Sequence, residues 1–585
     1  MQAGEATISI GGDWPRMSMA QVQAALTAPG APFEMATETI RGVPTRIWKN
    51  APANLAQLVA LSRSHGERLA TVHEDQRVTY EAQYRAIATL AKHLQDSGIG
   101  KGDRVALAMR NMPEWPVAFF AIVAIGAICV PLNAWWSPQE LAFGVTDSGA
   151  KMLIVDRQRH DRLGGDYGAM PALESVIVAR AREPLTAPAR ALEKVIGGCA
   201  DYATLPDVAL PDVALPEVAI APEDDATIFY TSGTTGKPKG ALGTHRNLCT
   251  NIFSSAYIAA RAQLRRGEMP PPAPQPKVGL LVIPFFHVTA CSASLMGAMA
   301  SGTTLVLMRK WDTAQALALI QRERVQVTGG VPTIAWQLLE HPDRDQYDLS
   351  SLEVVQYGGA PSAPDLVRRI HDVFGAMPGN GWGMTETMAT VTQHSAEEYL
   401  NRPTSCGPPV PVADLKIMSP YGISELPVGE VGELWARGPM IVKGYWNCPE
   451  ATAETFVDGW VRTGDLARLD EEGFCFIVDR AKDIIIRGGE NIYSIEVEDV
   501  LYAHPAVTDA ALVGMPDRVL GEVPVAVVHL CPGCAASEGE LQAFVRARLA
   551  GFKVPVAVRF SDTVLPRNAN GKIVKSELRQ MFAAA

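Results

Sequence analysis

The chain has 585 residues, of which 47% are hydrophobic, 20% charged and 7% aromatic. This is an ordinary globular composition, and the length suffices for several structural units whose cores need no disulfides. With 52 Lys and Arg against 63 Asp and Glu, the formal net charge is −11, which excludes the basic surface typical of nucleic-acid-binding proteins.

The N-terminal stretch shows no basic start followed by an apolar signal core. The longest apolar run, residues 117–132, is shorter than the ~20 residues that a membrane span needs. We therefore expect a cytoplasmic protein without an integral membrane span. Among nine cysteines, only Cys531 and Cys534 form a CxxC pair, and free thiols are a better interpretation than a zinc or redox site.

Along the chain, residues 1–50 form a lead-in without a clear pattern. An amphipathic helix is predicted from Thr79 to Gly98, with Thr79 as its cap. Short apolar strands are predicted at 104–109, 152–155, 176–178, 280–283, 304–307 and 352–357, with helices between them. This alternation predicts an α/β fold whose β-sheets are covered by helices on both faces.

Two proline-rich stretches, residues 205–222 and 262–277, are predicted to be a connector and a surface loop. After Asp479-Arg480, the last hundred or so residues have the pattern of a separate small unit. We therefore expect a large N-terminal domain, 1–480, and a small C-terminal α+β domain, 481–585.

A loop of glycines, hydroxyls and lysines follows the apolar strand at residues 228–230. Glycines let backbone N–H groups converge on an anion, and hydroxyls and lysines add donors and charge. The loop is not a P-loop, because Gly233 and Gly236 are too close together and Pro238 follows Lys237 where a Ser or Thr is needed. It predicts a different kind of phosphate-binding loop.

This loop resembles the signature of the adenylate-forming superfamily, which includes acyl-CoA synthetases, peptide-synthetase adenylation domains and luciferases. Further motifs follow in the family's order over about residues 50–580. The resemblance implies ATP and AMP binding by Thr231, Ser232, Gly233, Thr234, Thr235, Gly236, Lys237, Gly358, Gly359, Ala360, Pro361, Gly381, Trp382, Gly383, Met384, Asp465 and Arg480. Trp382 offers a flat face to the adenine, with a core tryptophan as the alternative interpretation.

Four residues are candidates for catalysis: Thr385, Glu386, His287 and Lys572. Glu386 is also the candidate Mg²⁺ ligand, since Mg²⁺ takes one or two carboxylates together with phosphate oxygens. Lys572 resembles the family lysine that joins the substrate carboxylate to the α-phosphate. Two anions that meet there repel each other by about 4 kcal/mol at 4 Å and an effective dielectric of 20, so cations are required.

The resemblance further implies that the small domain rotates about a hinge at Lys482. The rotation would withdraw Lys572 and bring the CoA-binding residues Gly488, Gly489 and Glu490 to the site. The expected co-substrates are therefore ATP and coenzyme A, with Mg²⁺. A small-molecule carboxylic acid completes the reaction, and a homodimer is an option that the sequence leaves open.

The acyl-site motif contains Phe285, Phe286 and His287, and core packing is an equally good interpretation of its apolar side chains. No carboxylate stands beside His287, so the ammonium of an α-amino acid would lack its counter-charge. A medium- or long-chain fatty acid is the first expectation and an aromatic cinnamate- or benzoate-type acid the second. An acyl-AMP ligase that loads a carrier protein, a luciferase-like oxygenase and a non-catalytic nucleotide-binding protein are the remaining alternatives.

Overall fold

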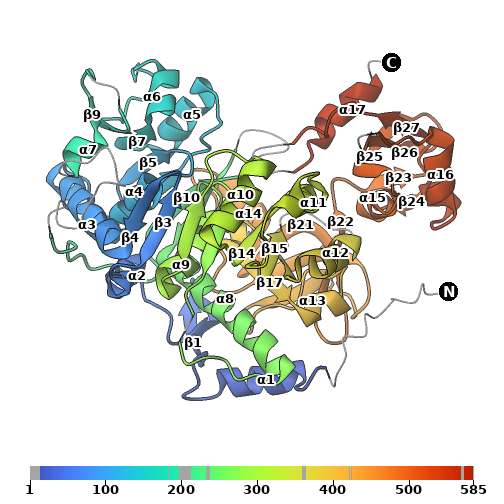
Figure 1. The fold of residues 1–585 in the computed structure, drawn as a ribbon, viewed down its shortest axis with the longest axis horizontal. Helices are drawn as coiled ribbons and strands as arrows, with labels where there is room; N and C mark the ends of the chain where they lie inside the picture. The colour runs from blue at the N-terminus through green and yellow to red at the C-terminus, as the bar shows by residue number, and fades with distance from the viewer. Residues whose placement is uncertain are drawn as a thin grey trace.

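The structure of the chain is a computed structural model. It describes residues 14–165, 167–181, 184–196, 212–231, 238–273, 275–358, 364–419, 422, 424–531, 533–567 and 572–583. Figure 1 shows a large unit made of the first four-fifths of the chain and a smaller unit, with the C-terminal end, set apart beside it. The predicted division into a large and a small part is confirmed at this level.

The first sheet of the described residues has seven strands, and its inner strands are parallel. Three of its strands, β5 (Arg104–Ala108), β7 (Met152–Asp156) and β8 (Ser175–Ala179), are almost entirely buried, as expected for a sheet covered on both faces. In spatial order the strands are β11 (Gly240–Thr244), β10 (Asp225–Tyr230), β6 (Ile128–Pro131), β5 (Arg104–Ala108), β7 (Met152–Asp156), β8 (Ser175–Ala179) and β9 (Ala189–Ala191).

The second sheet has eight strands, of which only the two edge strands run antiparallel to their neighbours. Its order is β17 (Ala389–Ser395), β16 (Met377–Met384), β15 (Val354–Gly358), β14 (Val327–Gly330), β12 (Val278–Leu281), β13 (Thr304–Leu307), β3 (Leu69–His73) and β4 (Gln76–Thr79). The carboxyl ends of its parallel strands therefore meet at one edge, which is where ligands bind in sheets of this kind.

Helices pack between and around these two sheets. The predicted amphipathic helix is α3, Tyr80–Asp96, and the Thr79 side chain accepts a hydrogen bond from the N–H of Ala82, as expected of an N-cap. The others are α2 (Leu55–Ser62), α4 (Glu114–Ala124), α5 (Pro138–Ser148), α6 (Arg157–Leu163), α7 (Leu192–Val195), α8 (His245–Arg266), α9 (Met296–Ser301), α10 (Thr313–Glu323), α11 (Pro332–Glu340), α12 (Pro364–Phe374), α13 (Glu397–Asn401) and α14 (Pro449–Thr455). A π-helical segment, η3 (Thr289–Leu295), precedes α9.

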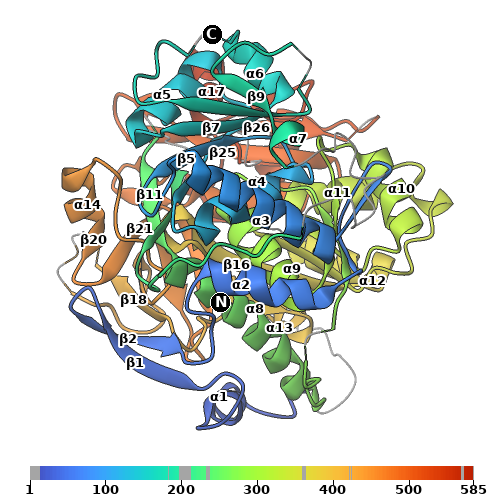
Figure 2. The ribbon, with the colours of Figure 1, turned by 90° about the vertical axis from the view of Figure 1, so that its left-hand side faces the viewer.

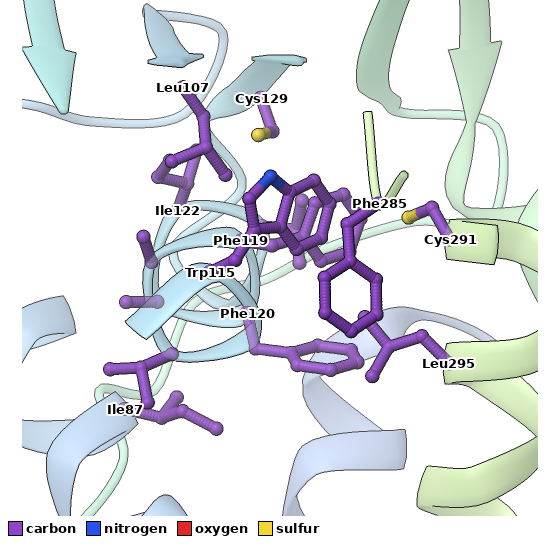
Figure 3. Close-up of a cluster of buried hydrophobic side chains, with 14 of the residues drawn as sticks. Ile87, Leu107, Trp115, Phe119, Phe120, Ile122, Cys129, Phe285, Cys291 and Leu295 are labelled. Carbon is purple, nitrogen blue, oxygen red and sulfur yellow. The ribbon is translucent and has the colours of Figure 1, made fainter. Parts of the chain in front are cut away.

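The largest core cluster joins α4 to strands of both sheets (Figure 3). Trp115 of α4 is fully buried and stacks on Phe119, with ring centroids 5.3 Å apart, and on Phe285, at 4.9 Å. Leu107 of β5 and Leu295 of η3 lie in the same cluster. This packing fixes the chain after β12, where Phe285 lies, against the first sheet.

The lead-in prediction is wrong for residues 14–50. These residues form helix α1 (Met19–Thr27) and the hairpin of β1 (Met35–Ile40) and β2 (Val43–Trp48), and α1 packs on α8. Figures 1 and 2 show this segment at the opposite end of the large unit from α5 and α6. Residues 1–13 lie outside the described part of the chain.

The predicted surface loop at 262–277 also needs correction, because α8 continues to Arg266 and ends at Gly267. Leu264 is buried in the cluster that contains Trp48, so tertiary packing extends the helix into the proline-rich stretch. No helix in the described residues combines the length and the apolarity that crossing a bilayer demands.

A third sheet follows and leads into the small unit. It consists of β18 (Asp414–Met418), β19 (Gly432–Arg437), β20 (Phe456–Val457), β21 (Trp460–Leu469) and β22 (Cys475–Arg480). The small unit then contains β23 (Ile485–Arg487), β24 (Glu490–Ile492), β25 (Val507–Asp517), β26 (Gly521–Leu530), β27 (Ala557–Phe560), α15 (Ser494–Tyr502), α16 (Glu538–Arg546) and α17 (Lys575–Ala583). Only four residues separate β22 from β23.

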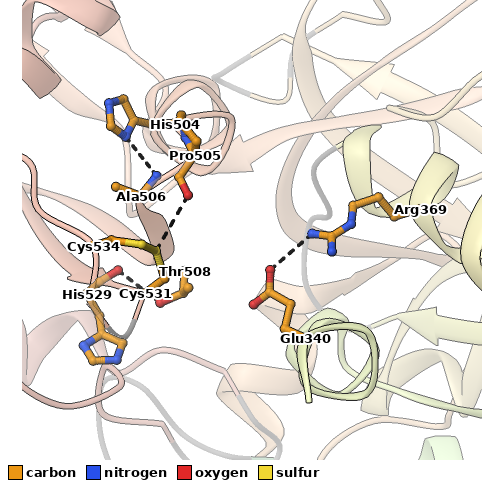
Figure 4. Close-up of a disulfide and its surroundings, with 9 residues drawn as sticks. All are labelled: Glu340, Arg369, His504, Pro505, Ala506, Thr508, His529, Cys531 and Cys534. Atoms are coloured by element: carbon orange, nitrogen blue, oxygen red, sulfur yellow. Dashed lines mark hydrogen bonds and ion pairs between the residues drawn. A yellow bond between two sulfur atoms is a disulfide. The ribbon is translucent and has the colours of Figure 1, made fainter. Parts of the chain in front are cut away.

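In the small unit, Cys531 and Cys534 form a disulfide after β26 (Figure 4). Their Cα atoms are 5.3 Å apart, within the range that a disulfide requires. The expectation of free thiols is therefore wrong for this pair, because the turn after β26 brings the two side chains together. The other described cysteines are free, and most are buried.

Candidate active site

A cavity of about 1480 Å³ lies between α8 and the face of the eight-stranded sheet and reaches the small unit. Its walls come mainly from α8, η3, α9 and strands β12, β14, β15, β16 and β17. The candidate residues that line it are Thr231, His287, Gly358, Gly381, Trp382, Gly383, Met384, Thr385, Glu386, Arg480 and Lys572. Residues 341 positions apart in the chain, from Thr231 to Lys572, thus share one cavity.

Several predicted nucleotide-binding residues fall outside the described part of the chain. These are Ser232, Gly233, Thr234, Thr235, Gly236 and Lys237 of the glycine-rich loop, and Gly359, Ala360 and Pro361 after β15. Their roles stay predictions. Both flanking ends are described, since Thr231 donates its N–H to the carbonyl of Lys239 at 2.8 Å, and Gly358 ends β15.

Glu386 lies in a turn of 3₁₀-helix, Thr385–Thr387, directly after β16. The residue is 7% exposed, and its Oε1 accepts a hydrogen bond from the Tyr445 hydroxyl at 2.6 Å. Burial raises the pKa of Glu386, while Tyr445, Lys572 and Arg480 act in the opposite direction. The residue is therefore a buried anion with cations nearby and one carboxylate oxygen not engaged by Tyr445.

Lys572 is half-buried and lines the cavity with Glu386. Burial, followed by the positive charge of Arg480, lowers the pKa of Lys572 to about 8, although Asp465 and Glu386 oppose the shift. Burial thus makes the positive charge of this lysine costly, and a further anion in the cavity would stabilise it. An incoming phosphate or carboxylate would supply that anion.

This environment predicts a pH dependence for any step that needs the Lys572 cation. Because the pKa in the free protein is about 8, the charge is present below that pH and lost above it. We expect kcat/KM for ATP, measured by diphosphate release, to fall as the pH rises through about 8, whereas kcat keeps its value to higher pH because bound ATP favours the cation. A kcat/KM that stays flat to about pH 10 would contradict this prediction.

His287 lies six residues after the end of β12, and its Nδ1 accepts the N–H of Thr289 at 3.3 Å. The proton of the neutral ring is therefore on Nε2. Burial, and then the charge of Lys572, lower the pKa of His287 to about 4. The ring is thus neutral at physiological pH and offers the cavity a hydrogen-bond donor rather than a charge.

Trp382, Asp465 and Arg480 form one hydrogen-bonded group. The indole N–H of Trp382 donates to Oδ2 of Asp465 at 2.8 Å, and Nε of Arg480 lies 3.3 Å from Oδ1. Trp382 is 9% exposed and Asp465 7%. Asp465 is not among the residues that line the cavity, but it holds two residues that are.

The prediction that Phe285 and Phe286 line the acyl pocket needs correction. Among the described residues, the cavity lining includes His287 but neither phenylalanine. Phe285 is fully buried against Trp115 (Figure 3), and Phe286 packs edge-on against Trp135 at 5.9 Å. Core packing on α4 explains Phe285, whereas Phe286 is buried behind Trp135, a residue of the cavity lining.

The predicted hinge and CoA-binding residues lie away from the cavity. Lys482 stands between β22 and β23, where the chain passes into the small unit. Gly488, Gly489 and Glu490 form the exposed turn from β23 to β24, and both glycines have positive φ values, 61° and 92°. None of these four residues lines the cavity in this arrangement. Their roles stay predictions.

Sequence reasoning missed Tyr445, which lines the cavity and contacts two other residues of the site. Its hydroxyl bonds Glu386, and the Nζ of Lys239 lies 5.0 Å from the centre of its ring. The residue is 59 positions from Glu386, in a segment that pairs with β11 through Ala241. A tyrosine beside Gly444 carries no local signal of this role.

Away from Lys572, the cavity continues along the strands of the sheet. Its lining along β15 runs from Gly358 back to Glu353, the residue before that strand, about 16 Å at roughly 3.3 Å per residue. Glu353 and Lys277 form an ion pair of 2.6 Å at this far end. The apolar side chains between the two ends include Ile252, Ile258, Leu281, Val327, Val331, Ile334 and Val354.

Polar side chains of the lining include Gln356 of β15, and Gln393 and Ser395 of β17. They lie around two glycines of β16, because Gln356 and Ser395 both pair with Gly379, and Gln393 pairs with Gly381. Neither glutamine side chain has a hydrogen-bond partner among the described residues. Both amides are therefore available to a polar group of a bound molecule.

Comparison with known proteins places these features in context. Residues 59–446 match the family described as "AMP-binding enzyme", and residues 496–572 match the "AMP-binding enzyme C-terminal domain". The chain is 36% identical over 527 residues to a feruloyl-CoA synthase of Amycolatopsis sp, covering 90% of this chain and 98% of that protein. It is 35% identical over 504 residues to a long-chain-fatty-acid–CoA ligase of Bacillus subtilis, covering 84% and 87%.

Solved structures show the same similarity. The o-succinylbenzoate CoA synthetase of Bacillus subtilis, in complex with its acyl-adenylate intermediate, aligns with a TM-score of 0.73 and 29% identity. The alignment covers 91% of this chain and 98% of that one. The similarity thus spans both the large and the small unit.

Proposed function

Because this chain belongs to the family of AMP-binding enzymes, we propose that it is an acyl-CoA ligase that works through an acyl-adenylate. It joins a carboxylic acid to coenzyme A and cleaves ATP to AMP and diphosphate. The observation that carries the proposal is the cavity in which Lys572, Glu386, Thr385 and Arg480 meet at one end of an apolar channel. Charged groups for two anions and apolar walls for an acyl tail thus lie in one space.

In the first half-reaction, a carboxylate oxygen of the acid bonds to the α-phosphorus of ATP, and the bond from that phosphorus to the diphosphate breaks. No protein nucleophile takes part. Lys572 neutralises the meeting anions, and Thr385 donates a hydrogen bond to the α-phosphate. The neutral His287 donates from Nε2 to the acid, which orients its carboxylate. Such positioned charge is the main source of catalysis in attack at phosphorus.

Glu386 fits the role of the magnesium ligand. It is buried, it lines the cavity, and only one of its two oxygens is engaged by Tyr445. Mg²⁺ commonly binds one or two carboxylates and completes its coordination with phosphate oxygens and water. When bound, the ion would neutralise charge on the phosphates. The hydroxyl of Tyr445 holds the Glu386 carboxylate in place for it.

In the second half-reaction, the thiol sulfur of CoA attacks the carbonyl carbon of the mixed anhydride. The carbon–oxygen bond to AMP breaks, and the thiol proton is released to water. Lys572 would obstruct this step where it now lies. We propose that the small domain, residues 481–585, rotates about Lys482 and brings Gly488, Gly489 and Glu490 to the cavity of the large domain. A rotation of this kind orders two reactions at one site.

The first candidate substrate is a medium- or long-chain fatty acid. The channel extends about 16 Å along β15, far beyond the length of a single aromatic ring. The side chains along it are mostly aliphatic, and burying each methylene in such a channel contributes about 0.8 kcal/mol. A long aliphatic tail gains the most from this space.

An aromatic acid is the second candidate, and one feature of the channel favours it. The unpartnered amides of Gln356 and Gln393 would hydrogen-bond to hydroxyl or methoxy groups on a ring. Against a plain alkyl tail, the same amides would stay unpaired, at a cost of about 1–3 kcal/mol each. The feruloyl-CoA synthase among the relatives acts on an acid of this type.

A panel of acids tests the choice of substrate through CoA-dependent release of AMP. For a fatty-acid ligase, kcat/KM should rise about fourfold for each added methylene until the channel is full. Highest activity with a cinnamate- or benzoate-type acid would instead select the second candidate. AMP release with a carrier protein but not with CoA would contradict the proposed ligase.

Substitution of both glutamines by leucine separates the two substrates further. In Gln356→Leu/Gln393→Leu, a fatty-acid ligase should keep or gain activity on long chains, whereas an aromatic-acid ligase should lose at least about tenfold in kcat/KM. Gln337→Leu serves as the control. Gln337 also lines the cavity, but its side chain already accepts a hydrogen bond from the indole N–H of Trp311.

We also propose that the enzyme works in the cytoplasm. The free cysteines of the described residues fit a reducing compartment, whereas the Cys531–Cys534 disulfide does not itself favour one. The remaining question of a homodimer is settled by light scattering of the purified chain, because a dimer would have twice the 62.8 kDa of the monomer.

A further inference from the structure

A second, smaller cavity of about 210 Å³ lies apart from the proposed active site. It is lined by His73, Asp156, Arg157, Arg180 and Arg309, together with Met112 and Gln158. As far as the structure describes the chain, the two cavities share no lining residue. The charge, burial and position of these side chains form a built site whose residues have no role in the bond-making steps proposed above.

The position of this small cavity follows from the two sheets. Asp156 ends β7 and pairs with Ala179 of β8, and Arg180 follows directly. From the other sheet, His73 ends β3, whose neighbour β13 ends two residues before Arg309. Two pairs of parallel strands, one pair from each sheet, thus end at this cavity, and ligands bind at the carboxyl ends of strands in open α/β sheets.

The cavity carries excess positive charge in a protein whose net charge is −11. Within the described residues, neither Arg157 nor Arg309 has a hydrogen-bond or ion-pair partner. Arg180 pairs with Glu114 at 2.6 Å. Among the described residues that line the cavity, Asp156 is the one carboxylate, and Arg159 already neutralises it at 2.8 Å. Two guanidinium groups therefore remain without a counter-ion at the cavity.

His73 is the second and independent sign of a ligand. Its side chain is only 4% exposed, yet neither ring nitrogen has a hydrogen-bond partner among the described residues. Burial, followed by the charge of Arg180, lowers the pKa of His73, with Arg309 acting in the same direction, while Glu74 and Gln76 oppose the shift. A neutral histidine there can donate one hydrogen bond, and leaving it unmade is costly.

The surroundings of the cavity are also cationic. Burial, and next the charge of Arg159, lower the pKa of Arg110 to about 10. The N–H of Arg110 bonds Asp156 at 3.0 Å, and its guanidinium lies 4.7 Å from the ring of Trp135, which lines the large cavity. Positive charges this close together repel one another, and a bound anion between them would relieve that repulsion.

We propose that this cavity binds a phosphate group through Arg157, Arg309 and His73. Guanidinium groups bind phosphate oxygens in a planar, bidentate fork, and a tetrahedral phosphate has enough oxygens for all three side chains. At about 30 Å³ per water, the cavity holds several waters, which is room for one phosphate. Its source is either a phosphate of the substrate CoA or a separate phosphorylated metabolite.

Titration calorimetry with inorganic phosphate tests the site, on the full chain with its nucleotide site saturated by AMP. We expect one phosphate per chain, and at least about tenfold weaker binding in Arg157→Gln/Arg309→Gln. The matched control Arg190→Gln/Arg518→Gln removes the same charge at exposed positions that have no hydrogen-bond or ion-pair partner in the described part of the chain, and it should bind as the unmodified chain does. Equal binding in all three proteins, or equal affinity for acetate, would overturn the proposal.

Two further measurements complete the test. Arg157→Lys/Arg309→Lys should recover part of the phosphate binding, which a misfolded variant would not do, and the melting temperature checks folding of each variant directly. A comparison of KM for CoA and for 3′-dephospho-CoA then identifies the ligand. This comparison rests on the proposed ligase activity, whereas the phosphate titration does not. If KM for CoA rises in the Gln variant but KM for 3′-dephospho-CoA does not, the ligand is the 3′-phosphate of CoA. Unchanged values for both, with phosphate binding lost, assign the site to a separate metabolite.

Discussion

Replacing Lys572 with alanine is expected to slow formation of the acyl-adenylate about 10³-fold, while thioester formation from pre-made acyl-adenylate falls less than about tenfold. The first number follows from charge. Two anions about 4 Å apart repel by about 4 kcal/mol at an effective dielectric of 20, and each 1.36 kcal/mol of barrier is a factor of ten in rate. The lysine is placed to remove this repulsion in the first step only.

Each half-reaction of the Lys572 variant is measured alone. Diphosphate release without CoA reports adenylation, and conversion of synthetic acyl-adenylate with CoA reports thioester formation. Lys575→Ala is the control, because Lys575 lies three residues on but pairs with Glu498 at 2.8 Å and bonds Ser494. Its loss should affect both steps alike through the stability of the small unit. Equal loss of both steps in the Lys572 variant would contradict the division of roles.

Replacing Lys482 with proline is expected to have the opposite effect. Adenylation should remain within a few-fold of the unmodified chain, and thioester formation should fall by about 10² or more. Proline fixes its φ angle near −65° and also restricts the residue before it. A hinge at this position could then no longer change its torsion angles, and the arrangement that places Lys572 at the cavity would persist.

The comparison variant at the hinge is Lys482→Ala, which loses the same side chain but keeps its torsional freedom. It should catalyse both half-reactions at nearly the normal rate. In the present arrangement, Asp479 of β22 also bonds the N–H and hydroxyl of Ser494 at the start of α15. Normal thioester formation in the proline variant would show that the turn between β22 and β23 is not the hinge.

Much of the large unit could be predicted from local patterns. The predicted strand at 304–307 is β13 without change, and those at 104–109 and 152–155 differ from β5 and β7 by one residue. These strands are apolar on both faces, because sheets with helices on each side bury every residue. Local sequence carries that signal. It also carries the Thr79 cap, which satisfies an N–H of the first turn of α3.

The N-terminal segment could not be predicted this way, because its order depends on a distant partner. Val22, Phe33 and Trp48 are buried only because α8 lies beneath them, and Trp48 also bonds Ser254 of that helix. Read alone, residues 14–50 contain scattered apolar residues with no regular spacing. The disulfide likewise depends on the turn after β26, which brings Cys531 and Cys534 within bonding distance.

The site was predictable in its charged residues and less so in its neighbours. Glu386, Arg480 and Lys572 each stand in a motif of hydroxyl, glycine or turn residues, and all three line one cavity. Phe285 lies two residues from His287, and the sequence alone could not decide which of them faces the cavity. Stacking on Trp115 of α4, a tertiary contact, decides it.

The account depends most on the claim that the acid's own carboxylate attacks the α-phosphate of ATP in this cavity. An acid from the panel, labelled with ¹⁸O in its carboxylate, tests that claim most directly. With ATP and CoA present, one ¹⁸O should appear in the phosphate of the AMP released in each turnover. If the AMP carries no ¹⁸O and the label is found in diphosphate or phosphate instead, the acyl-adenylate mechanism is wrong.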